Sequence, residues 1–446
     1  MPVAAADHST SGYTRQLFLY FGPLTLLIYM ALPQGLLLDF ATSYMLKDQL
    51  HASATQLSAF RLLTAIPVYL AFVFGLARDL WNPLGLRDRG FFLVFAPVTA
   101  AVFLWMALSR LSYAGLVGGM LLAMISFRFV AAAYGGLIAL VGQEKLVSGR
   151  LSALWSAVSY SLYAAGSFAS GYAAAHWSAR QVFLLMAVLA ALIACQGLWK
   201  PRAVFNHTYD QPQALGSNFV GDLKRLVRHR AVYPAVLINF LWYFSPGSST
   251  PMLYYLTNQL HASNATFSYY YGIQVISFIP TMLLYGFLCR KVALRKLLWW
   301  GAIVAVPQYI PLAFIHSANA ALVLAVPMGL VGGLATAAYI DLAMRSCPPG
   351  MQGTLMMLVD AGIILSYRGG DVLGSWIYGS SPVHGILYCV IAITVVYALI
   401  LPVMLLIPKE LIATADGEAN PAVTAEVLAE IGATGSRSGA RLPAAG

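Results

Sequence analysis

Six ionisable residues lie within long apolar stretches of this sequence: Asp39, Arg61, Arg128, Asp360, Arg368 and Asp371. A charge at the centre of a membrane-spanning helix costs on the order of 3 kcal/mol unless it faces a partner or a water-filled cavity. Such residues are typical of solute and proton pathways, so they indicate transport chemistry. Arg61 is close enough to the end of its stretch for its side chain to reach the membrane interface, so it is a weaker candidate for a solute or proton pathway.

Arg128 lies near the middle of its apolar stretch, within Ser126-Phe-Arg-Phe-Val130, and no acid is near it in sequence. Its planar fork of donors suits an anionic group of a solute. The alternative is a buried ion pair with an acid from another helix, such as Asp39. The sequence leaves both interpretations open.

Asp360, Arg368 and Asp371 share one apolar stretch. Arg368 and Asp371 are three residues apart, so they can pair on one helix face, and Arg368 can also balance an anionic solute. Asp360 and Asp371 share a face at heights roughly 16 Å apart. We expect Asp360 or Asp371 to load and unload a proton during transport. The alternative is a static network of ion pairs between helices.

Asp39 follows Pro33-Gln34-Gly35, a sequence that weakens a helix. Because broken backbone within a membrane often lines a solute path, we expect Gln34 and Asp39 to contact the solute, and Asp39 is also a candidate proton carrier. Asp39 can instead be the partner of an arginine. Tyr254 belongs to a group of aromatic residues that can stack on a flat ring, although aromatics near span ends commonly act as interfacial anchors.

Charged residues at predicted span ends indicate conformational locks rather than solute contacts. Asp79, Arg87 and Arg89 lie in or beside one short loop, and Asp341 and Arg345 are four residues apart at the end of another predicted span.

The chain has no motif that indicates catalysis. It lacks a phosphate-binding P-loop, an HExxH zinc motif and a GxSxG nucleophile motif. Its four cysteines form no CxxC pair, so we expect no metal site and no cofactor. The sequence therefore predicts a protein that is not an enzyme.

Composition predicts an all-α integral membrane protein. The chain has 446 residues, of which 60% are hydrophobic and 9% charged, against roughly 25% charged in soluble domains. A net charge of +10 can suggest nucleic-acid binding, but the basic residues form short clusters between apolar stretches, so we exclude that partner. Twelve spans of suitable length are predicted at 17–46, 56–78, 91–109, 114–141, 151–176, 180–199, 232–258, 265–289, 297–315, 318–344, 353–379 and 384–407.

The spans divide the chain into a cytoplasmic tail (1–16), a six-helix bundle (17–199), a linker (200–231), a second six-helix bundle (232–407) and a polar tail (408–446). With both termini in the cytoplasm, 20 of the 26 lysines and arginines fall on that side, as the positive-inside rule requires. Residues 1–12 have no basic region before a short apolar core, so we expect the first span to serve as its own insertion signal. The short loops suit a bacterial inner membrane.

The linker predicts a basic amphipathic helix on the lipid surface. Phe219, Leu223, Leu226 and Val227 repeat at helical spacing, with lysine and arginine residues between them. In the tail, Asn420-Pro421 predicts the start of a short helix.

The two predicted bundles contain a repeated segment. Tyr44–Ser53 recurs as Tyr254–Ser263, with seven of ten positions identical at an offset of 210. Each copy joins the first span of its half to the second, and Gly75 before Asp79 has a counterpart in Gly286. A six-helix unit used twice in the same orientation fits the parallel halves of the major facilitator fold, in which the halves move about a central cavity.

Several motifs resemble those of the folate–biopterin transporter family, a branch of the major facilitator superfamily. In the first half they are Leu32-Pro-Gln-Gly35, Tyr44–Leu50, Ile66-Pro67 and the Gly75 to Asp79 segment. In the second half they are Pro246, Met252–Leu260, Tyr285-Gly286, Leu294-Arg-Lys-Leu297 and Cys347-Pro-Pro-Gly-Met-Gln-Gly-Thr354. The resemblance covers roughly two-thirds of the chain and implies a carrier of folate or a pterin.

Two positions depart from this family. Ala71-Phe72 replaces a common lysine–proline step, and Gln352 replaces a common glutamate before the glycine–threonine pair. The loop from Trp81 to Gly90 also resembles that of muropeptide permeases and acetyl-coenzyme A transporters. The alternatives are therefore a carrier of a muropeptide- or nucleotide-like solute, and a receptor or assembly factor that transports nothing.

Overall fold

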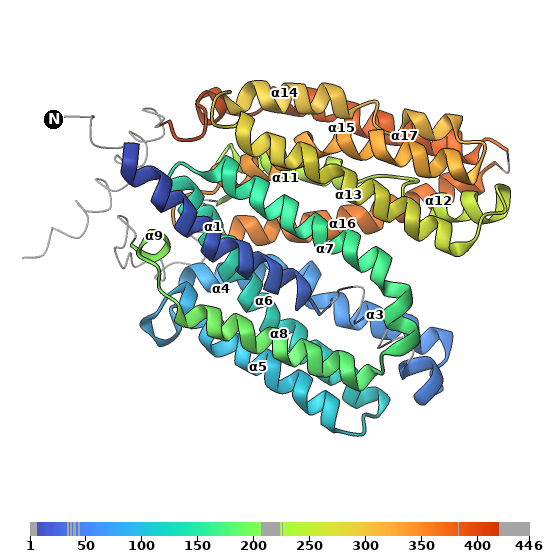
Figure 1. Cartoon of the computed structure of the whole chain (residues 1–446), viewed down its shortest axis with the longest axis horizontal. Coiled ribbons are helices and arrows are strands. Elements are labelled where there is room, and N and C mark those ends of the chain that lie inside the picture. Colours follow the sequence, from blue (N-terminus) through green and yellow to red (C-terminus); the bar gives the residue numbers. More distant parts are fainter. Residues whose placement is uncertain are drawn as a thin grey trace, which may run out of the picture.

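The structure, a computed structural model, describes residues 7–33, 35, 38, 42, 45–206, 224, 226–381 and 383–418. Every regular element in these ranges is helical, and the helices form two groups, lower and upper in Figure 1. The first half contains α1 (Asp7–Met30), α3 (Ala54–Tyr69), α4 (Ala71–Leu80), α5 (Asp88–Leu108), α6 (Tyr113–Glu144), α7 (Ser148–His176) and α8 (Ala179–Leu198).

The short α9 (Arg202–Phe205) follows the first half. The second half contains α11 (Val232–Tyr243), α12 (Thr250–Tyr254), α13 (Asn264–Leu288), α14 (Leu294–Ala305), α15 (Ala318–Arg345), α16 (Gln352–Gly379), α17 (Gly385–Ala398) and α18 (Ile400–Met404). These helices cover the six segments predicted for that half.

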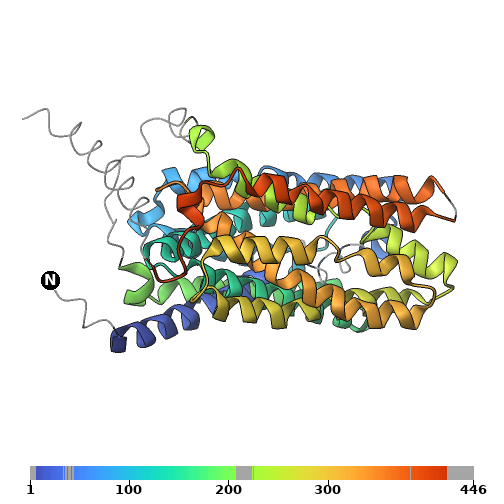
Figure 2. The same cartoon turned by 90° about the horizontal axis from the view of Figure 1, so that it is seen from above.

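The long helices of both halves run between the same two ends of the molecule (Figure 2). We call the end where α1 begins, and where α9 and residues 405–418 lie, the terminal end; it is on the left in Figure 1. The other is the opposite end. Of the predicted linker helix, Phe219 and Leu223 lie outside the described residues, as does the predicted tail helix.

Eight segments in the described ranges are long and apolar enough to cross a membrane by length and composition: Ala59–Leu80, Asp88–Leu108, Tyr113–Glu144, Ala179–Leu198, Thr266–Leu288, Leu294–Phe314, Ala318–Arg345 and Gly385–Met404. The helices α1, α7, α11 and α16 fall short of that test. α16 carries three charges, α7 carries repeated serines, and α11 ends after 12 residues. We find α7 and α16 at the contact between the halves, where a uniformly apolar surface is not required.

The backbone repeats where the sequence repeats. A π-helical turn covers Met45–Gln49 and another covers Tyr255–Gln259, at the same offset of 210. Each is followed by a histidine with positive φ, His51 at 47° and His261 at 51°. The two halves therefore share local geometry as well as residues at this position.

Two predicted spans are interrupted rather than continuous. The prediction of one helix over 232–258 is wrong, because α11 ends at Tyr243 and α12 begins at Thr250. Pro246 lacks a backbone N–H and Gly247 has a φ of +106°, so a helix cannot continue there. The helix expected over 297–315 likewise stops at Ala305 and resumes as a 3₁₀ turn over Ile310–Phe314.

The first helix extends further than the sequence indicates. The polar residues before position 17 were expected to form a tail, but α1 begins at Asp7. Tyr13 on this extension donates a hydrogen bond of 2.8 Å to the carbonyl of Ala203. This contact with α9 stabilises helical turns that lie outside the apolar stretch.

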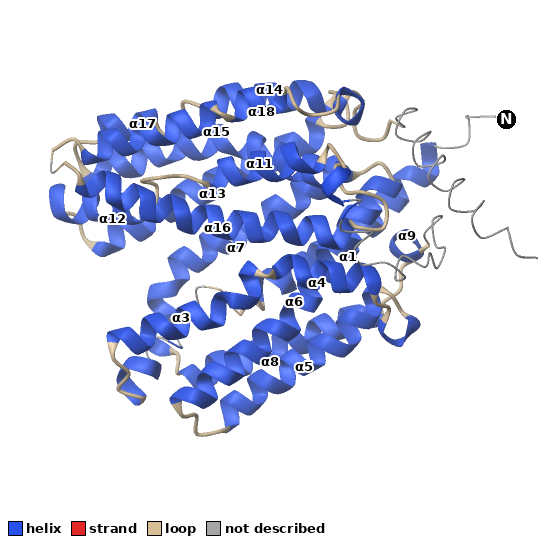
Figure 3. Cartoon of the chain, turned by 180° about the vertical axis from the view of Figure 1, so that it is seen from behind, coloured by secondary structure: helices blue, strands red, loops and turns tan. Residues whose placement is uncertain are grey.

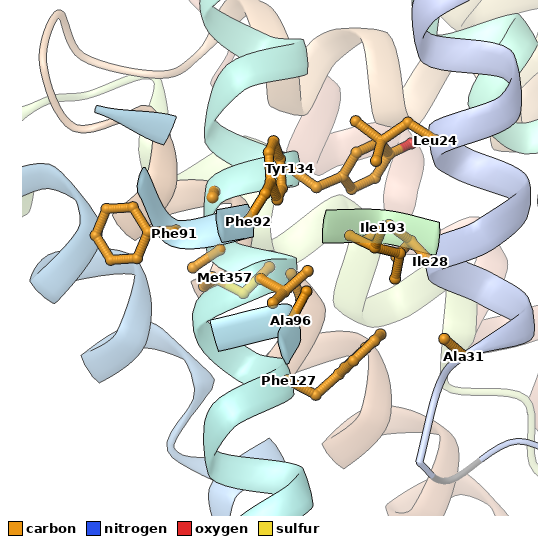
Figure 4. Close-up of a cluster of buried hydrophobic side chains, with 14 of the residues drawn as sticks. Leu24, Ile28, Ala31, Phe91, Phe92, Ala96, Phe127, Tyr134, Ile193 and Met357 are labelled. Carbon is orange, nitrogen blue, oxygen red and sulfur yellow. The ribbon is translucent and has the colours of Figure 1, made fainter. Parts of the chain in front are cut away.

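Each half has its own hydrophobic core. In the first half, buried side chains of α1, α5, α6 and α8 pack together, among them Leu24, Ile28, Phe92 and Ile193 (Figure 4). In the second half a separate cluster is built from α11, α13, α14, α15 and α17. Met357 of α16 belongs to the first cluster, so the halves are joined there.

The most extensive contacts between the halves are those of α4 with α16 and of α7 with α13, and α6 with α16 and α7 with α15 also meet. Figure 3 shows α16 and α7 between the two groups. A Cβ atom added at Gly75 of α4 would lie 2.3 Å from the carbonyl oxygen of Gly353 on α16. The approach of these two backbones at the terminal end therefore depends on glycine.

Gly75→Ala is expected to destabilise this contact, because the new methyl group has no space and the opposing atoms are backbone. Overpacking of this kind costs about 1–3 kcal/mol, which should lower the thermal unfolding midpoint of the purified protein. Gly118→Ala on α6 is the control, since its methyl group would meet nothing within 4 Å. Equal midpoints for the two variants would contradict the close approach of α4 and α16.

Candidate functional site

An ion pair joins the two halves within the helical bundle. Arg128 of α6 donates from Nη1 to Oδ2 of Asp360 on α16, at 2.7 Å. The Arg128 side chain is buried at 4% exposure, whereas the Asp360 side chain keeps 37% of its surface exposed. Both residues were predicted as site residues, and the ion pair with an acid from another helix, which the sequence left open, forms with Asp360.

Arg128 retains capacity to bind a further acceptor. Its Nε atom is buried and has no hydrogen-bond partner among the described residues. A buried donor without a partner costs about 1–3 kcal/mol, so an acceptor supplied by a ligand would be stabilised here. The guanidinium can therefore hold Asp360 and an anion together, or exchange one for the other.

Aromatic side chains from α1, α6 and α7 form a group that reaches Asp360 through two of its tyrosines. Trp155 donates a hydrogen bond of 2.6 Å to the hydroxyl of Tyr29, whose ring centroid is 6.0 Å from that of Tyr163. Tyr163 and Tyr29 are both within electrostatic range of Asp360. Tyr134 completes the group, 5.3 Å from Trp155 in an edge-to-face arrangement.

The aromatic group continues into the second half. Tyr160 of α7 packs on Phe278 of α13 with ring centroids 5.1 Å apart, and it lies beside Tyr243 of α11. Rings with hydroxyl groups offer both stacking surfaces and hydrogen bonds. The sequence gave no sign that α7 supplies three of these rings.

The second charged pair predicted on α16 does not form. Asp371 accepts hydrogen bonds from the backbone N–H of Thr250, at 2.9 Å, and from its hydroxyl, at 2.8 Å. These contacts cap the start of α12 after the break in the predicted span. Arg368 is exposed and forms no ion pair with any residue that the structure describes.

Three further residues were predicted to contact the solute. Gln34 and Asp39 lie outside the described residues. Tyr254 is 51% exposed on α12, toward the opposite end of the molecule.

At the terminal end, Asp79 connects the first half to the start of α16. Its carboxylate accepts hydrogen bonds from the backbone N–H groups of Gly353, at 3.0 Å, and Thr354, at 2.7 Å, and from the Thr354 hydroxyl, at 2.6 Å. The first N–H groups of a helix have no internal partner and carry partial positive charge, so a carboxylate is stabilised there. Asp79 therefore joins the first half to the second at this end.

Arg78 orients this carboxylate. Its guanidinium donates to Asp79 at 2.8 Å and forms two hydrogen bonds with Asp88, at 2.6 and 2.7 Å. A Cβ atom at Gly136 of α6 would lie 2.6 Å from the guanidinium carbon, so glycine leaves space for it. Sequence analysis did not single out Arg78 or Asp88 as site residues, and no spacing rule connects Asp88 to the end of α4.

A second set of contacts crosses the halves nearby. Gln143 of α6 donates to the carbonyl of Cys347 at 2.8 Å and accepts from Gln352 at 3.0 Å. Arg345 pairs with Asp341 at 3.0 Å, as the spacing of four residues predicted, and it also donates to the hydroxyl of Ser148 on α7 at 3.1 Å. The Asp341–Arg345 pair therefore contacts the opposite half.

Two further predicted lock residues contact other parts of the first half. Arg89 donates to the carbonyls of Gly197 and Leu198 at the end of α8 and lies over the ring of Phe205. The backbone N–H of Arg87 bonds to the side chain of Asn82 in the same loop. The contacts of Arg89 hold the start of α5 against the end of α8.

Two thiols are buried in the terminal end. Cys347 is 4% exposed beside Asp79, and Cys289 is 1% exposed at the end of α13. Burial raises the pKa of both thiols, so both are neutral near pH 7. Within the described ranges no cluster of three histidine, cysteine, aspartate or glutamate residues is placed to hold a metal ion.

Comparisons with known proteins agree on one family. The sequence profile of the Major Facilitator Superfamily matches residues 17–367. The "Folate-biopterin transporter" of Synechocystis sp. is 24% identical over 356 residues, which are 76% of this chain and 71% of the relative.

Solved structures show a similar arrangement of helices. A crystal structure of the transporter FucP in the outward conformation aligns with a TM-score of 0.63 at 15% identity, over 88% of this chain and 98% of FucP. A structure of a variant of FucP, the E. coli fucose:proton symporter, gives 0.64, and the human organic anion transporter MFSD10 gives 0.59, with the same coverage and identity.

Asp79→Asn is expected to loosen the terminal end, because an amide offers only one acceptor oxygen and no charge to the start of α16. Labelling of the native Cys347 by a maleimide should become at least about tenfold faster, equivalent to about 1.4 kcal/mol. Cys389 is 1% exposed within the second half, so its labelling rate should not change. A Cys347 that stays as protected as in the unaltered protein would contradict the role of Asp79.

Proposed function

Because the chain belongs to the Major Facilitator Superfamily, we propose that it moves a small organic anion across a membrane by alternating access. Family and fold confirm an all-α integral membrane protein of about twelve transmembrane helices in two six-helix halves. Members of this family are transporters, so the chain is not an enzyme. The solute and the coupling ion are the proposed part.

The observation that carries the proposal is the Arg128–Asp360 ion pair. It connects the halves within the bundle, one partner is partly exposed, and the buried partner has a donor to spare. A carboxylate on the solute would compete with Asp360 for the guanidinium, since Arg binds carboxylates through paired donors. Solute binding would thereby weaken a contact between the halves.

Asp360 is the proton carrier in this scheme. When the solute occupies Arg128, Asp360 loses its counter-charge in a site of low dielectric, and protonation removes the cost of that unpaired charge. Release of solute and proton lets the ion pair form again. Asp371 is less suited to this task because its two oxygens already bind Thr250.

The aromatic group favours a flat solute. Tyr29 and Tyr163 lie near Asp360, and Trp155 and Tyr160 contact these two rings, so the group offers both stacking surfaces and hydroxyl groups. A pterin ring with an attached carboxylate, as in folate, combines a stacking surface with the negative charge that Arg128 would bind. The folate-biopterin transporter similar to this chain supports this choice of solute, and the organic anion and fucose:proton transporters of the same fold support anion recognition and proton coupling.

Other predicted residues keep roles that await tests. Gln34 and Asp39 would contact the solute from the segment after α1, and Arg368 and Tyr254 would meet it nearer the opposite end. Asp79, Asp341 and Arg345 would hold the terminal end closed. We place that end on the cytoplasmic side of a bacterial inner membrane, because it carries most of the basic residues.

Uptake into liposomes tests this function. Folate, a pterin and a muropeptide fragment are supplied to the reconstituted protein with and without an inward proton gradient. We expect gradient-driven accumulation of one solute. Asp360→Asn should abolish accumulation but retain solute exchange, whereas Arg128→Ala should lower apparent affinity at least about tenfold, or about 1.4 kcal/mol.

Arg110→Ala is the matched control, because it removes a positive charge from an exposed loop at the opposite end. Full accumulation by Asp360→Asn would exclude Asp360 as the proton carrier. Absence of flux for every solute, with the protein shown to be folded, would remove the folate assignment and favour a muropeptide- or nucleotide-like solute or a role without transport.

A further inference from the structure

The segment that follows the last span folds back onto the terminal end. After α18, residues Lys409–Ile412 form a 3₁₀ turn, and Ile407 and Ile412 are buried in the core of the second half. The backbone N–H of Asp416 donates to the carbonyl of Cys289 at 2.8 Å. The segment is therefore fixed to the second half up to Asp416.

The side chain of Asp416 contacts the first half. Its carboxylate is 1% exposed and accepts from the backbone N–H of Gly149, at 3.0 Å, and from Nε of Arg150, at 2.8 Å. Gly149 is the second residue of α7, so the carboxylate caps the start of that helix. Nη2 of Arg345 lies 3.9 Å from the same carboxylate.

This arrangement repeats the one made by Asp79. Asp79 extends from the first half to Gly353, the second residue of α16, and Asp416 extends from the second half to Gly149, the second residue of α7. The helices α7 and α16 are the fifth spans of their halves. Each carboxylate thus caps the fifth span of the other half.

The internal repeat does not supply the second carboxylate. Gly75 corresponds to Gly286, so the counterpart of Asp79 falls at Cys289 or Arg290, and neither is acidic. Asp416 is bound through its backbone to the carbonyl of Cys289. A residue from outside the repeat therefore places an acid where the repeat lacks one.

We propose that Asp416 is the lock of the second half, which holds the terminal end closed and must leave α7 when that end opens. This role rests on the alternating movement of the halves in the proposed function. It adds a positioning residue, from a segment outside the twelve spans, to the transport cycle.

The surroundings of Asp416 fit a lock that releases as a unit. Arg345 joins it to Asp341, to Ser148 and to the carbonyl of Thr414, so both halves share this network. Burial raises the pKa of Asp416, with a further increase from the neighbouring Asp341 and an opposing effect of Arg150. A Cβ atom at Gly149 would lie 2.9 Å from Cys289, so glycine allows the close approach.

Labelling of native cysteines in the full-length protein tests the lock. Asp416→Asn should increase the maleimide labelling rate of Cys289 at least about tenfold, read for each cysteine by mass spectrometry. Cys389 should keep its rate, because it is buried within the second half away from this contact. Glu418→Gln is the control, since Glu418 accepts a hydrogen bond from Ala415 in the same segment and has no ion pair with the first half among the residues that the structure describes.

Arg150→Gln removes the partner on the first half and leaves the segment intact, so it should also expose Cys289. The double variant should add little to either single change, because both remove one contact. Unchanged Cys289 labelling in both single variants would overturn the proposal, as would a parallel rise at Cys389, which reports general unfolding. The labelling assay requires no solute. Its result therefore stands even if the proposed transport function fails its own test.

Discussion

The ion pair between Arg128 and Asp360 limits the states that the protein can occupy. Each charge lies within a bundle of apolar helices, where an unpaired charge is costly. Arg128 belongs to one half and Asp360 to the other, at 2.7 Å. Separation of the halves therefore requires a substitute for each charge, and a solute carboxylate with a proton is a chemically balanced pair of substitutes.

The terminal end is held by a different interaction, the capping of helix starts by carboxylates. The first N–H groups of α16 bind Asp79, and those of α7 bind Asp416. Both helices lie at the contact between the halves. A rocking movement would therefore separate the two halves first at the starts of these helices. The glycines at 75 and 149 permit the close approach that these contacts need.

Hydropathy and spacing predicted much of the fold. The apolar stretches correspond to the helices, the repeat at an offset of 210 recurs as matching π-helical turns, and the Asp341–Arg345 pair forms within one helix as expected. Contacts between distant residues could not be predicted. Arg128 and Asp360 are 232 positions apart, and their pairing depends on which helices meet.

Local rules also failed where the chain breaks. Asp371 was expected to pair with Arg368 three residues away, but the interruption before Thr250 leaves an N–H group that needs an acceptor. An N–H group without an acceptor at the start of a helix costs more free energy than an exposed ion pair gains, since such a pair contributes about 0–1 kcal/mol.

The measurement that most directly tests the central claim is the number of protons taken up per solute bound, from calorimetric titrations in buffers of different ionisation enthalpy. The account predicts uptake of about one proton by the unaltered protein, since one carboxylate loses its counter-charge, and none by Asp360→Asn; equal uptake by both would contradict it.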